Sequence, residues 1–166
     1  MRSEFLDIFL AAHCSFCVST GSGFDAIPQI FRRPRIYVNF LPIYQDIIVN
    51  RLIIFPKQIR DMESSSVLTL NQIIERSLRD AHAQSSYTDA GVEIVDLTPG
   101  EIVSAITEMA MRVEGRFVPT LDEIERDQKV KEIFRTRPGL QGPLMREDIR
   151  GEFAACFLSK YPNWLE

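Results

Sequence analysis

The sequence predicts an α/β fold, in which a partial, Rossmann-like parallel sheet is flanked by helices and followed by a helical carboxyl-terminal region. Two apolar runs, residues 15–19 and 35–40, are separated by a glycine-rich turn and a short helical segment. Strand-helix-strand units of this kind cross over with a right hand and place their two strands parallel. The near-continuous apolar character of residues 15–19 suits a strand that is covered on both faces.

Length and composition indicate an ordinary globular domain. The chain has 166 residues, of which 45% are hydrophobic and 25% charged, so we expect one domain over residues 1–166. Within it, residues 1–115 form the α/β part and residues 116–166 the helical part. A net charge of -4, from 19 basic and 23 acidic residues, argues against a protein that neutralises a nucleic-acid backbone.

The three cysteines do not form a disulfide framework, and their odd number favours a reducing, cytoplasmic setting. Cys14 and Cys17 are spaced as C-x-x-C, but the run around them has the pattern of a strand, on which residues three apart point to opposite faces. We interpret both as small, buried apolar side chains, with metal or redox chemistry as the alternative.

No segment has the pattern of a membrane anchor. Glu4 and Asp7 interrupt the apolar amino-terminal run, whose spacing fits one face of an amphipathic helix better than a secretory signal. The apolar region at residues 36–55 carries too many polar groups, among them Asn39, Asp46 and Arg51, for a bilayer-spanning helix.

The predicted elements follow from periodicity, caps and breakers. Thr98 and Glu101 have the spacing of a capping box, as do Thr120 and Glu123, while Thr69 and Asn71 are alternative caps for an earlier helix. We predict helices at 3–12, 24–31, 70–80, 99–113, 120–135 and 146–160, strands at 15–19, 35–40, 52–55 and 92–95, a turn at 87–91, and loops at 64–66 and 136–145.

The turn Thr20-Gly21-Ser22-Gly23 is the strongest candidate binding site. Free N–H groups at the start of a helix attract anions, and glycine lets the backbone approach a phosphate closely. The turn lies between a predicted strand and a predicted helix, which is the context that a phosphate-binding turn requires. A plain tight turn is the alternative, and Asp25 in the first helical turn counts against a dianion. We therefore predict that Thr20, Gly21, Ser22 and Gly23 contact a phosphate or diphosphate.

Asn39 is a second candidate because it falls near the carboxyl end of a predicted strand, where parallel sheets bind ligands. Its amide could bond a sugar hydroxyl, a base edge or a phosphate, or could simply close the strand. The arginines Arg32, Arg33 and Arg35 follow the short helix at its far end, where cations are favourable. We do not expect them to contact a phosphate at the glycine turn.

The histidines give no sign of catalytic or metal chemistry. Neither His13 nor His82 has a neighbouring pattern typical of a catalytic triad or a metal site. His82 lies near a predicted helix end, which favours a solvated or capping role. The acidic run at residues 122–127 is typical of a solvated helix face. We therefore predict no metal and no cofactor.

Longer runs resemble a known family. The run Ser19-Thr-Gly-Ser-Gly-Phe-Asp-Ala-Ile-Pro-Gln-Ile-Phe-Arg-Arg-Pro34, followed by Tyr37-Val-Asn-Phe-Leu-Pro42, resembles the carboxyl-terminal, donor-binding half of a family of bacterial glycosyltransferases of the GT-B type. Later segments are similar in the same order: Leu68-Thr-Leu70, Gly91-Val-Glu-Ile-Val95, Thr98-Pro99, Glu101-Ile102, Phe157-Leu158, Tyr161-Pro162 and Trp164-Leu165. The resemblance covers nearly the whole chain.

The resemblance implies a nucleotide-sugar-dependent glycosyltransferase that acts in the cytoplasm, with surface polysaccharide as the expected acceptor. It assigns Thr20, Gly21, Ser22 and Gly23 to the donor diphosphate and Asn39 to a further donor contact. The acceptor site and the catalytic base come from an amino-terminal domain in proteins of this kind, so we expect this chain to be a fragment or split gene product. A separate amino-terminal domain or chain is then an expected partner.

Two other functions are compatible with the same turn. A sugar-nucleotide epimerase of related architecture would isomerise a nucleotide sugar rather than transfer its sugar. A non-catalytic interaction module would bind no nucleotide. A fragment of a donor domain has fewer strands than the complete sheet. We therefore also expect an exposed sheet edge where the missing strands would pair, which promotes association of the isolated chain.

Overall fold

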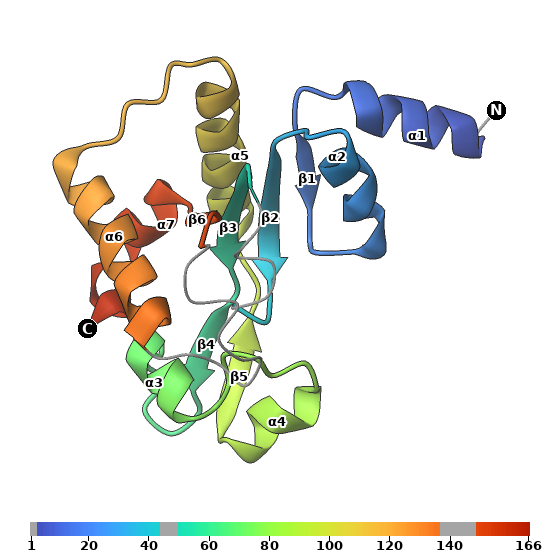
Figure 1. The fold of residues 1–166 in the computed structure, drawn as a ribbon. Coiled ribbons are helices and arrows are strands. Elements are labelled where there is room, and N and C mark those ends of the chain that lie inside the picture. The colour runs from blue at the N-terminus through green and yellow to red at the C-terminus, as the bar shows by residue number, and fades with distance from the viewer. Residues whose placement is uncertain (1–2, 44–49, 137–148) are drawn as a thin grey trace.

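A computed structural model of the chain describes residues 3–43, 50–136 and 149–166 (Figure 1). The helices are α1 (Glu4–His13), α2 (Ala26–Ile30), α3 (Leu70–Glu75), α4 (Gln84–Asp89), α5 (Pro99–Val113), α6 (Leu121–Thr136) and α7 (Ala155–Lys160), with 3-10 turns η1 (Gly23–Asp25) and η3 (Pro162–Leu165). The strands are β1 (Cys17–Ser19), β2 (Arg35–Phe40), β3 (Leu52–Pro56), β4 (Gln58–Asp61), β5 (Val92–Val95) and β6 (Glu152–Phe153).

The main sheet has four parallel strands in the order β1-β2-β3-β6. Cys17 pairs with Arg35, Arg35 with Leu52, and Ile54 with Phe153. The predicted α/β class, with a parallel sheet flanked by helices, is therefore confirmed, and this arrangement is compatible with a Rossmann-like fold. Figure 1 shows α5 behind the central strands, α6 and α7 on one side, and α1 and α2 on the other.

The centre of the sheet forms the core. All of β3 and nearly all of β2 are buried, as expected for parallel strands that are covered on both faces. Aromatic rings close the carboxyl-terminal side: the ring of Phe153 in β6 lies 6.2 Å from that of Phe134 in α6 and 5.2 Å from that of Trp164. The carboxyl-terminal tail therefore packs back on the domain.

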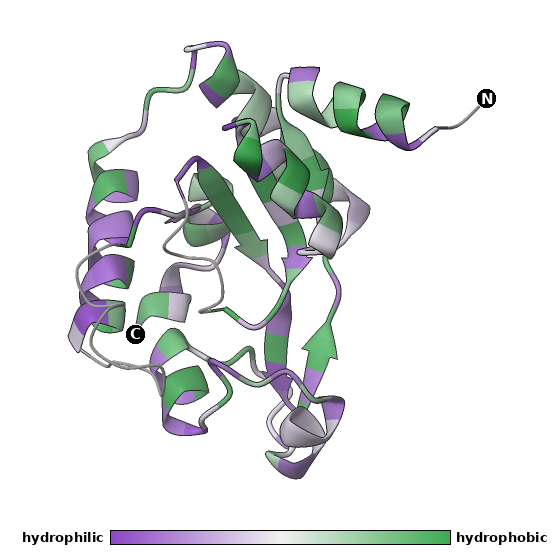
Figure 2. Cartoon of the chain, turned by 45° about the vertical axis from the view of Figure 1, so that its right-hand side comes forward, coloured by the Kyte–Doolittle hydropathy of each residue, from purple (hydrophilic) through white to green (hydrophobic). Residues whose placement is uncertain are grey.

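The amino-terminal edge is much less covered. β1 has only three residues, and the side chain of Val18 is 40% exposed, so the prediction of a strand covered on both faces is wrong at this position. Cys14 follows α1 and lies outside the strand; its thiol and that of Cys17 are free and only half-buried. The exposed apolar residues of α1, η1, α2 and the residue after α2 include Phe5, Leu6, Ile8, Phe9, Leu10, Phe24, Ile30 and Phe31. Figure 2 shows green, hydrophobic segments along α1.

A second sheet of two antiparallel strands lies beyond the main one. β5 is the predicted strand, but it pairs with β4, which the sequence pattern did not reveal. β4 was missed because Ile59 is its one buried residue, so its apolar signal is weak. The predicted turn at 87–91 is mostly helix α4, and α3 ends at Glu75 rather than at residue 80.

The capping predictions are confirmed in detail. The Thr98 hydroxyl accepts from the Glu101 N–H, and the Glu101 carboxylate accepts in return from the Thr98 N–H at 2.7 Å. Thr120 and Glu123 form the same reciprocal pair at the start of α6. These local contacts satisfy N–H groups that a helix leaves free at its first turn.

The predicted helix at 146–160 is wrong over the first half of its described part, residues 149–154, and confirmed over the second half, α7. Glu152 and Phe153 form β6, and a helix begins only at Ala155. Apolar spacing alone could not distinguish these cases, because two strand residues fit within one helical turn. Residues 146–148, like the predicted loop from residue 137 onwards, lie outside the described residues, while Thr136 still belongs to α6.

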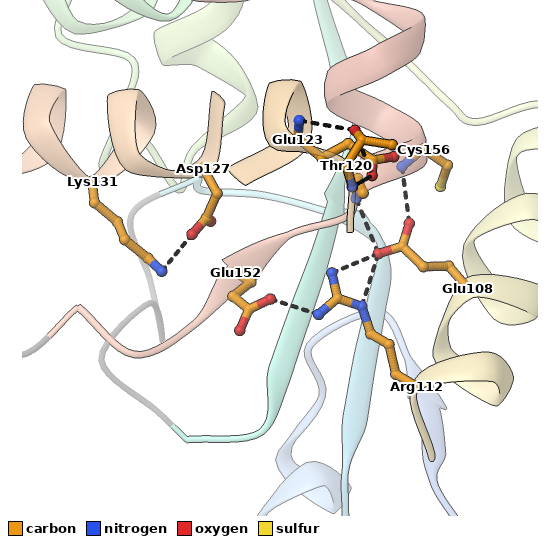
Figure 3. A network of polar contacts seen from close by, with 9 residues as sticks. Glu108, Arg112, Thr120, Glu123, Asp127, Lys131, Glu152 and Cys156 are labelled. Atoms are coloured by element: carbon orange, nitrogen blue, oxygen red, sulfur yellow. Dashed lines mark hydrogen bonds and ion pairs between the residues drawn. The ribbon is translucent and has the colours of Figure 1, made fainter. Parts of the chain in front are cut away.

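A buried carboxylate joins α5 to this region (Figure 3). Glu108 accepts hydrogen bonds from the N–H groups of Ala155 and Cys156, at 3.0 and 2.9 Å. Arg112 pairs with Glu108 at 2.9 Å and with Glu152 of β6 at 2.6 Å. Glu108 therefore provides the cap for α7 from another helix and fixes β6 against α5.

Among the residues described, no helix has both the length and the apolar character needed to cross a bilayer.

Candidate functional site

The glycine turn between β1 and α2 is constrained by the fold itself. Gly21 has a φ of +84°, a conformation that L side chains adopt at a cost. A Cβ atom on this residue would lie only 2.6 Å from Cδ2 of Phe40 in the neighbouring strand β2. Gly21 is therefore needed for the close approach of the turn to β2, whatever the turn binds.

The rest of the turn leaves its donors free. Ser22 precedes η1 in an extended conformation and makes no side-chain cap. Within the described residues, the N–H groups of Ser22, Gly23 and Phe24 and the hydroxyls of Thr20 and Ser22 form no hydrogen bond with protein. A Cβ atom on Gly23 would meet nothing within 4 Å, so the space in front of the turn is open. The turn therefore presents exposed donors of the kind that bind anions.

Asp25 is buried at the end of η1. The residue is 4% exposed, and neither carboxylate oxygen has a hydrogen-bond partner among the described residues. Its carboxylate therefore does not cap the free N–H groups of the turn. Burying a carboxylate without a hydrogen-bond partner lowers the stability of the folded state, so Asp25 is unfavourable for folding.

Asn39 bends the end of β2. Its φ of +52° interrupts the register between β2 and β3, a conformation that asparagine adopts more readily than most residues. The side-chain oxygen Oδ1 accepts a hydrogen bond of 2.7 Å from the Leu97 N–H, ahead of α5. The amide oxygen thus has a structural partner, while the Nδ2 group makes no hydrogen bond to a described residue.

A polar pocket of about 440 Å³ lies where the turn, the ends of β2 and β3, and the β4-β5 sheet meet. We call it the strand-end pocket. It is lined by Thr20, Asn39, Leu41, Pro42, Lys57, Ala81, His82, Gln84, Tyr87, Ile94 and Asp96. The structure thus brings Thr20 and Asn39 to one pocket, whereas Gly21, Ser22 and Gly23 are not in its lining.

The charged pair in this pocket was not found from the sequence. Lys57 directly follows β3, and its Nζ lies 2.8 Å from the Asp96 carboxylate, which follows β5. Its position after a buried strand was the available signal, the same one that selected Asn39. Because Asp96 is 71% exposed at its side chain, an incoming anion can compete with it for Lys57.

The pocket also contains His82 and Tyr87. His82 is exposed, while the Tyr87 hydroxyl donates to the Ala81 carbonyl at 2.7 Å. Burial raises the pKa of Tyr87 to about 12, so this phenol stays protonated at neutral pH and is not a general base. Among the described residues, no group of three His, Cys, Asp or Glu side chains is placed to hold a metal ion.

A comparison of this chain with protein-family models, with curated proteins and with solved structures found no match. The class that the fold itself defines is an α/β protein with a polar pocket at the carboxyl ends of its parallel strands.

Proposed function

We propose that this chain is the donor-binding half of a nucleotide-sugar-dependent glycosyltransferase of the GT-B type, acting in the cytoplasm on an acceptor such as a surface polysaccharide. The observation that carries the proposal is the turn with three free N–H groups and two free hydroxyls at the carboxyl edge of a parallel sheet. Ligands of open parallel sheets bind at this edge. The resemblance of residues 19–42 to GT-B donor domains supports the same assignment.

In this proposal the turn holds the donor diphosphate. The N–H groups of Ser22, Gly23 and Phe24 donate to phosphate oxygens, and these bonds strengthen as negative charge develops on the leaving diphosphate. Lys57 exchanges Asp96 for the phosphate, and the Nδ2 group of Asn39 donates to a sugar hydroxyl or a phosphate. No metal or cofactor is required by this scheme, in which the nucleotide sugar is the substrate.

The catalytic base belongs to a separate acceptor-binding domain or chain in this proposal. Glycosyl transfer needs a base near the acceptor hydroxyl in addition to donors on the leaving group. Among the pocket residues, Tyr87 is protonated, Asp96 is paired with Lys57, and His82 is exposed with no hydrogen bond to a described residue that would orient it as a base. We therefore expect the purified chain to bind a nucleoside diphosphate without transferring sugar, and transfer by this chain alone would contradict that part.

Thermal unfolding with uridine, guanosine, adenosine and cytidine diphosphates tests donor binding. We expect one of them to raise the Tm, because a ligand that binds only the folded state stabilises it. Gly23→Ala places a methyl group in front of the free N–H groups and is expected to weaken binding by about tenfold. Gly100→Ala is the matched control, since a Cβ there also meets nothing within 4 Å but lies at the start of α5.

Gly21 is unsuitable for this test because any side chain there would collide with Phe40. No response to any of the four nucleotides would contradict donor binding and favour the interaction module. Incubation with the corresponding nucleotide sugar separates the remaining alternative, because an epimerase would return an isomerised donor.

A further inference from the structure

A second pocket lies at the opposite edge of the main sheet, where β2 and β3 begin. It has a volume of about 540 Å³ and is lined by Gln29, Arg32, Arg33, Arg35, Asn50 and Arg51. We call it the arginine pocket. Arg32 and Arg33 follow α2, while Arg35 begins β2 and Arg51 immediately precedes β3. A backbone hydrogen bond of 2.9 Å from the Arg35 N–H to the Arg51 carbonyl joins the two strand starts.

The four guanidinium groups have no counter-ion in the part of the chain that the structure describes. None of Arg32, Arg33, Arg35 and Arg51 forms an ion pair with a carboxylate of a described residue. Elsewhere, Arg60, Arg76, Arg112, Arg116 and Arg126 each pair with an aspartate or glutamate. The arginine pocket is therefore a local concentration of positive charge on a chain whose net charge is -4.

Neutral oxygen atoms orient these side chains without neutralising them. Arg33 Nε donates to the Ala12 carbonyl at 2.6 Å, and Arg51 Nη1 donates to the Arg32 carbonyl at 3.1 Å. Arg35 Nη1 donates to Gln29 Oε1 at 3.1 Å. Guanidinium groups held in this way lose little rotational freedom on binding an anion, so the site is preorganised.

Arg35 provides a second, independent observation. It is only 1% exposed, and its Nε is buried with no hydrogen-bond partner in the part of the chain that the structure describes. Arg35 Nη1 donates to the Tyr37 hydroxyl at 3.2 Å, which is also neutral. Asp25 is buried in the same unit, but its oxygens bond to nothing and it does not line the pocket. A buried cation with an unused donor indicates that the fold leaves this charge for a ligand.

We propose that the arginine pocket is an anion site that binds a phosphoryl group. Several guanidinium groups that converge from different backbone segments suit a tetrahedral dianion, whose oxygens can each accept hydrogen bonds from a different arginine. A carboxylate has only two oxygens and would leave part of the set unused. This site does not depend on the glycine turn, which lies at the other end of β1, beyond Ser19.

The phosphoryl group belongs either to a small phosphate ester or to a phospholipid headgroup, and pyrophosphate is the probe for both. Thermal unfolding of the purified chain is measured in sodium pyrophosphate and in sodium chloride of the same ionic strength. We expect a higher Tm in pyrophosphate, and a binding constant about tenfold weaker in Arg51→Gln and in Arg32→Gln, since each loses a charge-assisted hydrogen bond. Both residues are exposed, so the variants are expected to fold.

Two matched variants decide the location of the site. Arg116→Gln removes an exposed arginine that pairs with Glu114 away from the pocket, and should bind pyrophosphate like the wild type. Gly23→Ala weakens any pyrophosphate binding at the glycine turn, to which the proposed function assigns a diphosphate, and should leave the part of the response that Arg51→Gln and Arg32→Gln weaken. Equal Tm values in pyrophosphate and chloride would overturn the proposal. Loss of the response in Gly23→Ala, with Arg51→Gln unaffected, would also overturn it and place the anion at the turn.

Vesicles separate the two sources of the phosphoryl group. The chain is sedimented with phosphatidylcholine vesicles that do or do not contain phosphatidylglycerol. Sedimentation that requires phosphatidylglycerol and is lost in Arg51→Gln supports the site with a lipid headgroup as its ligand. A pyrophosphate response without such sedimentation supports it with a soluble phosphate ester.

Discussion

Buried charged side chains are paired differently in the carboxyl-terminal half of this domain and in its amino-terminal unit, which runs from α1 to the start of β2. Glu101 and Glu108, both 5% exposed, have partners for their carboxylates on several elements. Asp25 and Arg35, which are at least as buried, keep side-chain atoms without a hydrogen-bond partner among the described residues. Asp127 Oδ1 in α6 has none either, but the other oxygen of Asp127 pairs with Lys131. Charge in the first region fixes helices to one another and to β6. Charge in the second region does not join elements of the fold in this way, and the proposed anion site uses Arg35 for a ligand.

Of the substitutions that test this difference, one at Glu108 should have the largest effect on the free energy of unfolding. Glu108→Ala removes the acceptor for two N–H groups of α7 and leaves Arg112 without its most buried partner. We expect a loss of about 3 kcal/mol in the free energy of unfolding, measured by urea denaturation. Glu114→Ala, at the exposed end of the same helix, should change it by less than about 0.5 kcal/mol. Similar losses of stability in Glu108→Ala and Glu114→Ala would show that the buried carboxylate contributes no more than the exposed one.

The next largest effect is the difference in stability between substitutions at the two glycines of the turn. Gly21→Ala combines an unfavourable positive φ with a collision against Phe40, and we expect it to cost about 2 kcal/mol. Gly23→Ala meets open space and should cost less than about 0.5 kcal/mol. Denaturation curves of the two variants test this directly. An equally stable Gly21→Ala would show that the turn does not need glycine for its approach to β2.

Glu101 should make stability depend on pH in the acidic range. Burial opposes its ionisation, but hydrogen bonds from Tyr161, Thr98 and Lys160 outweigh burial and hold the pKa of Glu101 at about 2, below its ordinary value of 4.5. The contribution of ionised Glu101 to the free energy of unfolding is therefore complete above pH 4.5 and is lost as the pH falls towards 2.

Glu101→Gln should consequently be less stable than the wild type at neutral pH by about 1–2 kcal/mol, and should lose less on acidification. Urea denaturation at several values between pH 5 and pH 2 measures the difference. Asp61 also has a pKa of about 2 and remains in both chains, so only the difference between the two profiles is informative. Parallel profiles would contradict the role of Glu101.

The smallest effect is expected at Asp25. Asp25→Asn keeps the shape of the side chain and removes a charge that has no partner, so we expect a gain of about 1 kcal/mol in the free energy of unfolding. The variant should also bind pyrophosphate more tightly than the wild type, because a nearby negative charge is lost. A loss of stability would show that Asp25 is held by the charge of Arg35 and that the amino-terminal unit does satisfy its buried ions.

Local signals in the sequence predicted local structure well. The capping boxes at Thr98 and Thr120, and the strand that begins at Arg35, depend on residues within a few positions of one another. The sheet order β1-β2-β3-β6 could not be predicted in the same way. β6 has two residues, and its pairing with β3 brings together Ile54 and Phe153, which are far apart in the chain.

The candidate sites show the same limit. Thr20 and Asn39 could be selected because each follows a predicted strand, and the structure places both in the strand-end pocket. Lys57 and Asp96 meet only because β4 and β5 pair, and β4 was not visible in the pattern. The sequence did group Arg32, Arg33 and Arg35, but it could not add Arg51, which reaches them through the pairing of β2 with β3.

The hydrogen bond from the Leu97 N–H to Asn39 Oδ1 has a practical consequence. It joins the bend at the end of β2 to the segment that leads into α5, so any movement of Asn39 breaks or lengthens a bond to a single backbone amide. The rate at which that amide exchanges with deuterium therefore reports on the strand-end pocket, without a label in the pocket itself. A ligand that holds Asn39 in place should slow exchange at Leu97, whereas an anion bound only at the arginine pocket should leave it unchanged.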